Sequence, residues 1–206
     1  MSIFKAYDVR GLYPSELNEE LAYKIGRAFV SYFKIKEVVI GYDARASSSE
    51  LFKALSDGII DQGADVVDIG LASTPLLYFA SKEAEASIMI TASHLPKQYN
   101  GFKFCQKQGS PVSKEEIKEI EAIVEREQFY SQKIKVGQIK KIEQSQLMTD
   151  FINYNLSFLK GDKKLKIVLD TGNGMSSYTL PRIIEKIDSI NLIELYTEID
   201  FSFPNH

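Results

Sequence analysis

The chain has 206 residues and a composition that is ordinary for a globular protein, with 44% hydrophobic and 26% charged residues. Its formal net charge of -3 gives no overall positive field, which argues against a nucleic-acid partner. The single cysteine, Cys105, excludes an internal disulfide and a cysteine-rich zinc site, and we expect it to serve as a small apolar side chain in a strand.

Helices and strands are predicted to alternate from the N-terminus to about residue 126. Apolar runs predict strands at 37–43, 64–70 and 87–90. Helical spacing and typical start and stop residues predict helices after Asn18, from Ser48 or Ser49 to Gly63, from the cap Thr74 with Pro75 in the first turn, and from the capping box of Ser113 and Glu116. Alternation of this kind indicates an α/β sheet layered between helices.

The same pattern begins again near residue 140. An amphipathic helix is predicted at 146–160, where Gly161 can end it, and a strand, a glycine-containing loop, a helix and a strand follow between 164 and 198. We therefore predict mixed sheets layered between helices, with one complete domain at 1–142 and a partial second copy at 143–206. The second part is close to the lower size limit for a stable core, so we expect the chain to be the front of a longer protein.

The apolar run at 87–90 is followed directly by Ser93 and His94. Consecutive apolar residues indicate a strand buried on both faces, and the end of such a strand is where open α/β sheets bind ligands. The pair Asn100-Gly101 is typical of a turn. The alternation after it predicts that Lys103 lies on the face opposite two phenylalanine rings.

Several kinds of chemistry can be weighed for this loop. A serine hydrolase needs a base for Ser93, and His94 should point away from its neighbour in an extended segment. The sequence has no G-x-S-x-G elbow, no Rossmann glycine pattern and no Walker-A loop. Arg10, Arg45 and Lys103 are instead expected in or beside strand-end loops. Phosphoryl chemistry is therefore favoured, because it needs positioning and neutralisation of charge.

The distribution of apolar residues also indicates where in the cell the protein is expected. No stretch of the sequence is long and apolar enough for a membrane span, and the N-terminal residues lack the apolar core of a signal peptide. We therefore predict a cytoplasmic protein with no membrane partner.

Several motifs together resemble the α-D-phosphohexomutases, and most of all the bacterial phosphomannomutase/phosphoglucomutase group. They are FKAYDVRG at 4–11, GYDAR at 41–45, TASHLP at 91–96, YNGFK at 99–103, DTGNG at 170–174 and FPNH at 203–206. They follow one another in the order and at the spacing of that family, across essentially the whole chain. The resemblance implies a four-domain hexose-phosphate mutase, of which domain 1 and most of domain 2 are present here and domains 3 and 4 are missing.

The resemblance also implies roles for individual residues. Ser93 would pass its phosphoryl group to a hexose phosphate and regain one from a hexose 1,6-bisphosphate intermediate, so that phosphate moves between C1 and C6. Mg²⁺ would bind through a phosphoryl oxygen on Ser93, with its aspartate ligands outside this chain. The implied catalytic residues are Ser93, His94, Lys103, Arg10 and Arg45, and the implied substrate-binding residues are Tyr7, Arg10 and Lys103.

Departures from the family pattern qualify this picture. Leu95 stands where the family usually has Asn, and no Asp-Gly-Asp metal loop occurs. We therefore expect the isolated chain to be inactive, and a stand-alone, non-catalytic phosphosugar-binding or interaction module is the alternative. Mannose and glucose phosphates are expected as substrates ahead of glucosamine phosphate.

Two smaller expectations concern polar side chains near the predicted loops. Asp8 and Asp43 are the nearest acidic candidates for a metal, but each is followed closely by an arginine that can hold it in an ion pair. The serines at 47–49 and 176–177 are interpreted as helix-start residues whose hydroxyls bond backbone N–H groups.

Overall fold

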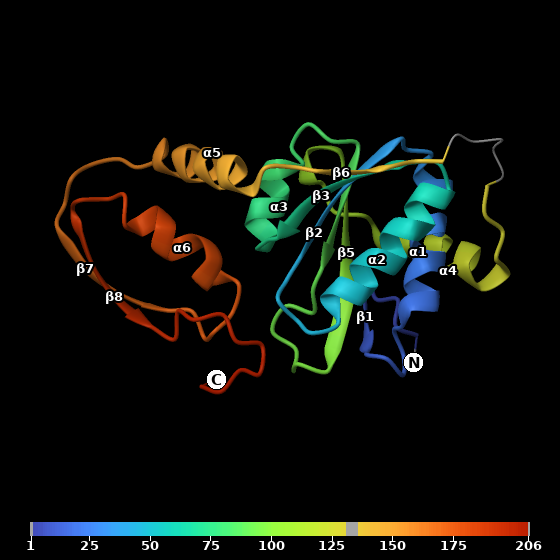
Figure 1. Ribbon diagram of the computed structural model, residues 1–206, viewed down its shortest axis with the longest axis horizontal. Coiled ribbons are helices and arrows are strands. Elements are labelled where there is room, and N and C mark those ends of the chain that lie inside the picture. The colour runs from blue at the N-terminus through green and yellow to red at the C-terminus, as the bar shows by residue number, and fades with distance from the viewer. Residues whose placement is uncertain (1, 131–135, 206) are drawn as a thin grey trace. The chain divides into compact units, whose positions relative to one another are not determined.

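The computed structural model describes residues 2–130 and 136–205 (Figure 1). The chain separates into two compact units, Met1–Ile142 and Glu143–His206. The assignment of these units as a first domain and a partial second domain stays a prediction. His206, the last residue of the FPNH motif, lies outside the described residues.

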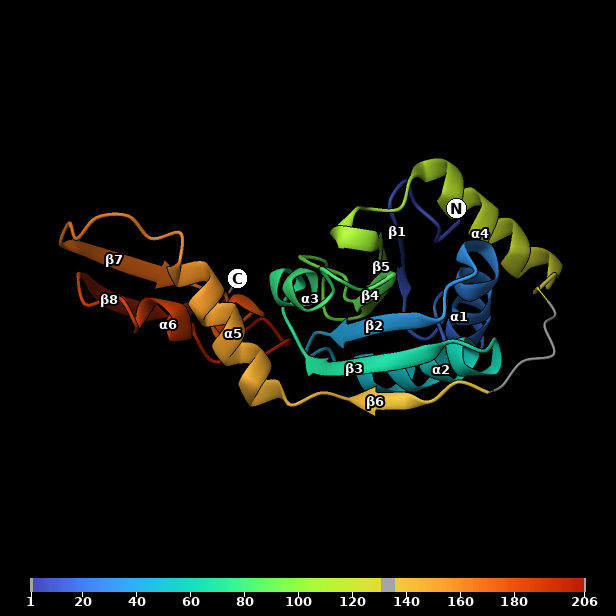
Figure 2. The same ribbon diagram turned by 90° about the horizontal axis from the view of Figure 1, so that it is seen from above.

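The first unit, as far as the described residues show, is built on a six-stranded mixed sheet in the order β1-β5-β4-β2-β3-β6. Strand β2 runs parallel to β3 and β4, whereas β5 runs antiparallel to β4 and β1. Strand β6 lies parallel to β3 at the edge of the sheet (Figure 2). The strands are β1 (Asp8–Leu12), β2 (Glu37–Tyr42), β3 (Asp65–Leu71), β4 (Ala86–Ile90), β5 (Tyr99–Gln106) and β6 (Ile139–Lys141).

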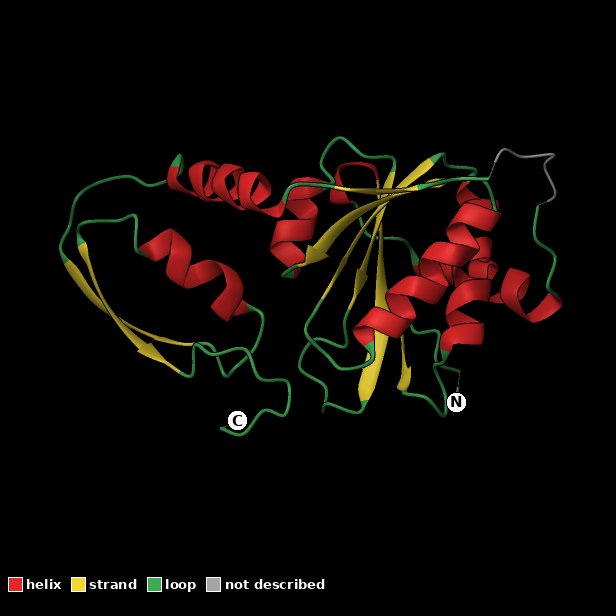
Figure 3. Ribbon diagram, in the orientation of Figure 1, coloured by secondary structure: helices red, strands yellow, loops and turns green. Residues whose placement is uncertain are grey.

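Helices cover both faces of this sheet, so the predicted α/β fold is confirmed. Helices α1 (Glu19–Phe33), α2 (Ser48–Asp61) and α4 (Lys114–Arg126) lie on one side, and α3 (Thr74–Ala80) lies on the other (Figure 3). A short 3₁₀ helix, η1 (Lys107–Gly109), follows β5. Among the helices of the described ranges, none has both the length and the apolar character needed to cross a membrane.

The capping residues in the sequence predicted the starts of several helices correctly. The Asn18 side chain accepts a hydrogen bond from the Leu21 N–H at 3.0 Å, and the capping box of Ser113 and Glu116 is formed. The cap of α3 is Ser73, however, one residue before the predicted Thr74. The proline after Thr74 then sits in the first turn, where its missing N–H costs nothing.

The hydrophobic core of the first unit explains the sequence pattern of its strands. Strand β4 is buried along its whole length, which confirms the prediction of a strand covered on both faces. Phe104 on β5 is fully buried and stacks on Phe29 of α1, with ring centroids 5.2 Å apart. Cys105 is also buried, as predicted, and burial raises the pKa of its thiol.

Two expectations about β1 and β5 are wrong. Asn100 and Gly101 do not form a turn, because both lie inside β5. Arg10 and Lys103 lie within the paired strands β1 and β5 instead of in strand-end loops. Gly101 is needed for close approach of the chains, since a Cβ atom there would lie 2.1 Å from the carbonyl oxygen of Val9.

The second unit contains a pair of parallel strands, with one helix before the first strand and another between the two strands. Strand β7 (Leu165–Asp170) pairs with β8 (Ile190–Leu195), and α6 (Ser176–Ile184) connects them, as the strand–loop–helix–strand pattern predicts. Helix α5 (Gln144–Leu156) ends well before Gly161, the predicted stop.

The DTGNG motif of the second unit forms the loop after β7. Asn173 has a positive φ of 61° and donates from its side chain to the carbonyl of Glu198 at 3.0 Å. The Asn205 side chain donates to Asn173 Oδ1 at 2.9 Å. The described part of the FPNH motif is thus fastened to the DTGNG loop.

Helices α1 and α2 pack with their backbones in close contact at two glycines. A Cβ atom on Gly58 would lie 2.1 Å from the carbonyl oxygen of Tyr23, and one on Gly26 would lie 2.4 Å from that of Leu55. Backbone atoms cannot rotate away as side chains do, so the helices must separate to admit a methyl group.

We expect Gly58→Ala to destabilise the first unit despite the better helix propensity of alanine. Overpacking of this kind costs about 1–3 kcal/mol, which corresponds to a fall in Tm of roughly 3–10 °C. Thermal unfolding followed by circular dichroism measures it. The control is Asp57→Ala at the neighbouring exposed position of α2. Equal Tm values for the two variants would contradict the packing argument.

Candidate active site

The topology of the sheet brings two loops together. Strands β2 and β4 are parallel neighbours, and Tyr42 lies opposite Ile90 at their carboxyl ends. The loop after β2 carries Asp43 and Arg45, and the loop after β4 carries Ser93. The Asp43 N–H donates to the Ile90 carbonyl at 3.0 Å, so the loops meet directly at this edge of the sheet. This is the position at which open α/β sheets hold their ligands.

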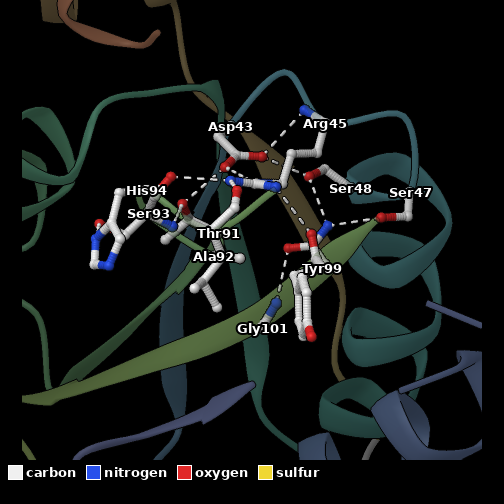
Figure 4. A network of polar contacts seen from close by, with 12 residues as sticks. Asp43, Arg45, Ser47, Ser48, Thr91, Ala92, Ser93, His94, Tyr99 and Gly101 are labelled. Carbon is white, nitrogen blue, oxygen red and sulfur yellow. Dashed lines mark hydrogen bonds and ion pairs between the residues drawn. The ribbon is translucent and has the colours of Figure 1, made fainter. Parts of the chain in front are cut away.

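Arg45 is the centre of the contact between the two loops (Figure 4). Its side chain is fully buried, and each of the five N–H donors of a guanidinium has an acceptor here. Nε donates to Asp43 Oδ2 at 3.1 Å. The four other donors bond backbone carbonyls of the second loop at 2.8–3.0 Å, namely those of Ser93, Leu95, Pro96 and Tyr99.

Asp43 balances the charge of Arg45 and is itself surrounded by donors. Besides Nε and the N–H of Arg45, it accepts from the hydroxyl of Ser48 at 2.9 Å and from that of Thr91 at 2.7 Å. Burial lowers the pKa of the Arg45 guanidinium, and the Asp43 carboxylate counteracts this. The predicted ion pair is therefore confirmed, and so is the pair between Asp8 and Arg10, at 2.8 Å.

Ser93 is exposed, but its backbone is held on both sides. Its N–H donates to Thr91 Oγ1 at 2.9 Å, and its carbonyl accepts from Arg45 Nη2 at 2.9 Å. Its φ is 56°, in the left-handed region that residues other than glycine seldom adopt. The hydroxyl of Ser93 is thus presented to solvent from a fixed and unusual backbone conformation.

The left-handed conformation of Ser93 corrects the expectation about His94. In an extended segment the two side chains would point apart, whereas here Ser93 Oγ lies 3.4 Å from Nδ1 of His94. This separation is long for an O–H···N hydrogen bond. Within the described residues His94 has no further partner, so a hydrolase-type triad with an orienting acid is not formed.

Three other predicted site residues lie on or beside β1 and β5. Arg10 donates from Nη1 to the carbonyl of Ala92 at 3.2 Å, which connects β1 to the Ser93 loop. Lys103 lies opposite Asp8 in the register of β1 and β5, so it shares a sheet face with Asp8 and Arg10. Tyr7 comes just before β1 and is 65% exposed.

Asn100 belongs to this region although the sequence did not single it out as functional. Its side chain is fully buried on β5 and donates to the hydroxyls of Ser47 at 2.9 Å and Ser48 at 3.1 Å. Its Oδ1 accepts from the N–H of Gly101 at 2.8 Å. The pairing of Asn with Gly in the sequence masked this residue, because the same pair is typical of turns.

The interpretation of the serines as helix caps is wrong at several positions. Among the described N–H groups of α2, none is capped by the Ser47 side chain. Ser47 and Ser48 bond Asn100, and Ser49 bonds the Glu50 carboxylate at 2.7 Å. At the start of α6, the Ser177 hydroxyl lies 2.7 Å from that of Thr171. These hydroxyls bond other side chains instead of capping backbone N–H groups at a helix start.

Sequence comparison identifies the fold on which this site is built. A family model described as phosphoglucomutase/phosphomannomutase, alpha/beta/alpha domain I, matches residues 1–131. The chain belongs to the phosphoglucomutase/phosphomannomutase family. Among its relatives are a phosphomannomutase of Vibrio cholerae, 35% identical over 100% of this chain and 46% of its own length, and a phosphomannomutase/phosphoglucomutase of Pseudomonas aeruginosa, 35% identical over 100% of this chain and 44% of its own length.

A solved structure gives the same result. The crystal structure of a phosphoglucomutase/phosphomannomutase family protein from Burkholderia thailandensis matches with a TM-score of 0.89 and 33% sequence identity. The match covers 99% of this chain and 46% of that protein. The chain therefore spans less than half the length of the curated relatives that it matches.

The described residues of this family member do not form a complete Mg²⁺ site. Mg²⁺ requires near-octahedral oxygen ligands, usually carboxylates together with phosphate oxygens. The described ranges contain no group of three or more His, Cys, Asp or Glu side chains placed to hold a metal. Asp8 and Asp43 already face arginines.

We expect Asn100→Ala to weaken the connection between β5 and the start of α2. The change leaves the buried hydroxyls of Ser47 and Ser48 without their amide donor, and an unsatisfied buried polar group costs about 1–3 kcal/mol. Chemical denaturation measures the loss in the free energy of unfolding. Gln98→Ala, at an exposed position nearby, serves as the control. The assignment fails if Asn100→Ala is as stable as the control variant.

Proposed function

We propose that the protein to which this chain belongs is a hexose-phosphate mutase that moves a phosphoryl group between C1 and C6 of a hexose. The observation that carries the proposal is Ser93. Its hydroxyl is exposed at the carboxyl end of β4, and its backbone is fixed by a buried charged network. Membership of the phosphoglucomutase/phosphomannomutase family supports the same reading.

In the proposed reaction Ser93 carries the phosphoryl group between two sugar positions. A hydroxyl oxygen of the hexose phosphate attacks phosphorus and gives up its proton, the bond from phosphorus to Ser93 Oγ breaks and Oγ takes up a proton, and a hexose 1,6-bisphosphate forms. In the second half Ser93 Oγ gives up its proton and bonds the phosphorus of the other phosphoryl group, and the bond from that phosphorus to the sugar oxygen breaks. The sugar oxygen that leaves regains a proton, and Ser93 is phosphorylated again.

The neighbouring side chains have distinct proposed tasks. His94 is the candidate to exchange a proton at the serine, because its Nδ1 lies 3.4 Å from Oγ. Arg10 and Lys103 share one sheet face and would neutralise charge on the equatorial phosphoryl oxygens. Tyr7, exposed just before β1, is proposed to contact the sugar.

Residues outside this chain complete the proposed site. Mg²⁺, the proposed cofactor, would neutralise phosphoryl charge, with one ligand from the phosphoserine and aspartate ligands from the remainder of the protein. Mannose and glucose phosphates are the proposed substrates, and the absent part is proposed to grip the phosphate that points away from Ser93.

We expect Ser93 to take up phosphoryl when the full-length protein is incubated with a hexose 1,6-bisphosphate. Peptide mass mapping should find the added phosphoryl mass on the peptide that contains Ser93, and Ser93→Ala should abolish both the label and the mutase activity. Ser49→Ala is the control, since among the residues that the structure describes this exposed hydroxyl bonds only the adjacent Glu50 side chain. Label on another serine, with none on Ser93, would refute the proposal.

We expect the purified 206-residue chain to show no mutase turnover. It lacks a complete Mg²⁺ site within its described residues, and the part proposed to grip the far phosphate of a bisphosphate lies outside it. The assay uses mannose 1-phosphate, Mg²⁺ and a hexose 1,6-bisphosphate, with the full-length protein as the positive control.

Turnover by the isolated chain near the usual enzymatic range, on the order of 10 per second, would show that half the protein suffices. Absence of turnover in the full-length protein as well, combined with tight binding of hexose phosphates, would favour a non-catalytic phosphosugar-binding module.

A further inference from the structure

We propose that Asp43, Arg45 and Thr91 are positioning residues that hold Ser93 in its left-handed conformation and so set the direction of its hydroxyl. This inference rests on the proposed function, because the direction of the hydroxyl matters only if Ser93 exchanges phosphoryl groups. It assigns Arg45 a different task from the direct stabilisation of phosphoryl charge.

The three side chains form a closed ring of hydrogen bonds with the backbone of Ser93. Asp43 Oδ2 accepts from Arg45 Nε at 3.1 Å and from the Thr91 hydroxyl at 2.7 Å. Arg45 Nη2 then donates to the Ser93 carbonyl, and Thr91 Oγ1 accepts from the Ser93 N–H, both at 2.9 Å. A single carboxylate therefore controls both peptide groups that flank Ser93 (Figure 4).

The need for such a ring follows from the backbone of Ser93. A φ of 56° brings the Cβ atom close to backbone atoms, so residues other than glycine adopt it only where the surroundings impose it. If the N–H of Ser93 lost its acceptor, the peptide could rotate towards negative φ. The Cβ and Oγ atoms would then point in a different direction from the fixed strand β4.

Arg45 cannot meet a phosphoryl oxygen without giving up a bond that it already makes. Its N–H groups all bond Asp43 or carbonyls of the Ser93 loop, and its side chain is fully buried. By contrast, no hydrogen bond or ion pair joins the Lys103 side chain to a residue that the structure describes. Direct contact with an anion therefore falls to residues such as Lys103, and Arg45 shapes the loop.

Thr91 offers the clearest test because only its hydroxyl takes part in the ring. Loss of Asp43 or Arg45 would leave a buried charge alone and endanger the fold. Thr91→Val keeps the shape of the side chain and leaves Asp43 paired with Arg45 and Ser48. Thr91→Ser keeps the hydroxyl, so it should restore what Thr91→Val loses.

The experiment measures phosphorylation of Ser93 in the full-length protein by a hexose 1,6-bisphosphate, in single turnovers at several bisphosphate concentrations. We expect Thr91→Val to lower the maximal rate on the order of 10- to 100-fold, with little change in the half-saturating concentration, because the Thr91 hydroxyl bonds Asp43 and the Ser93 N–H. Thr91→Ser should react close to the wild-type rate. Thr149→Val, which loses a hydroxyl bonded within α5, is the matched control.

A second readout follows the Ser93 N–H itself by hydrogen exchange. Exchange should be faster in Thr91→Val than in the wild type and in Thr91→Ser. Simple loss of folded protein would reduce the fraction that reacts instead of the rate. Arg45→Lys adds a test of charge against geometry, because lysine keeps the charge but not the planar array of donors. We expect this variant to be slow.

Each outcome bears on the proposal. A wild-type rate in Thr91→Val, or a Thr91→Ser rate as low as that of Thr91→Val, would overturn the role of Thr91. A wild-type rate in Arg45→Lys would show that Arg45 acts through its charge. If Ser93 of the wild type takes up no phosphoryl, the proposed function fails, and unchanged exchange of the Ser93 N–H in Thr91→Val would then overturn the positioning role as well.

Discussion

A charged pair removed from water needs a partner for nearly every donor and acceptor, and Asp43 and Arg45 find theirs in the loop that carries Ser93. Carbonyl groups between 93 and 99 satisfy the guanidinium, and hydroxyls help to satisfy the carboxylate. The stability of the buried pair therefore depends on the path of the loop, and the pair in turn fixes that path. A different loop path would leave a buried arginine with unmet donors.

The order of the strands in the sheet determines which side chains lie near Ser93. Parallel β2 and β4 bring Arg45 and Ser93 together, although they are distant in sequence. Antiparallel β5 and β1 then return along the same sheet and present Lys103 and Arg10 on one face. Arg45 is thus held near the serine by buried loop contacts, whereas Arg10 and Lys103 lie on the partly exposed surface of the sheet.

Sequence reasoning succeeded where the signal is local. The caps at Asn18 and at Ser113, and the buried strand before Ser93, depend on residues close together in the chain. It failed for β1 and for the pair Asn100-Gly101, because pairing with distant strands overrides turn propensity. The family motifs named the candidate site residues, but no pattern in the sequence indicates that Arg45 bonds carbonyls or that Ser93 has a positive φ.

The contacts of Arg45 with its loop are almost all to main-chain oxygen atoms, and this has a consequence for how the loop can change over evolutionary time. Every amino acid, proline included, offers the same carbonyl, so the anchor does not depend on which side chains occupy the loop. Leu95, where the family resemblance leads us to expect asparagine, illustrates this, because its carbonyl accepts from Arg45 Nη2 at 2.8 Å. The side chains around the serine can therefore change while the path of the chain stays the same.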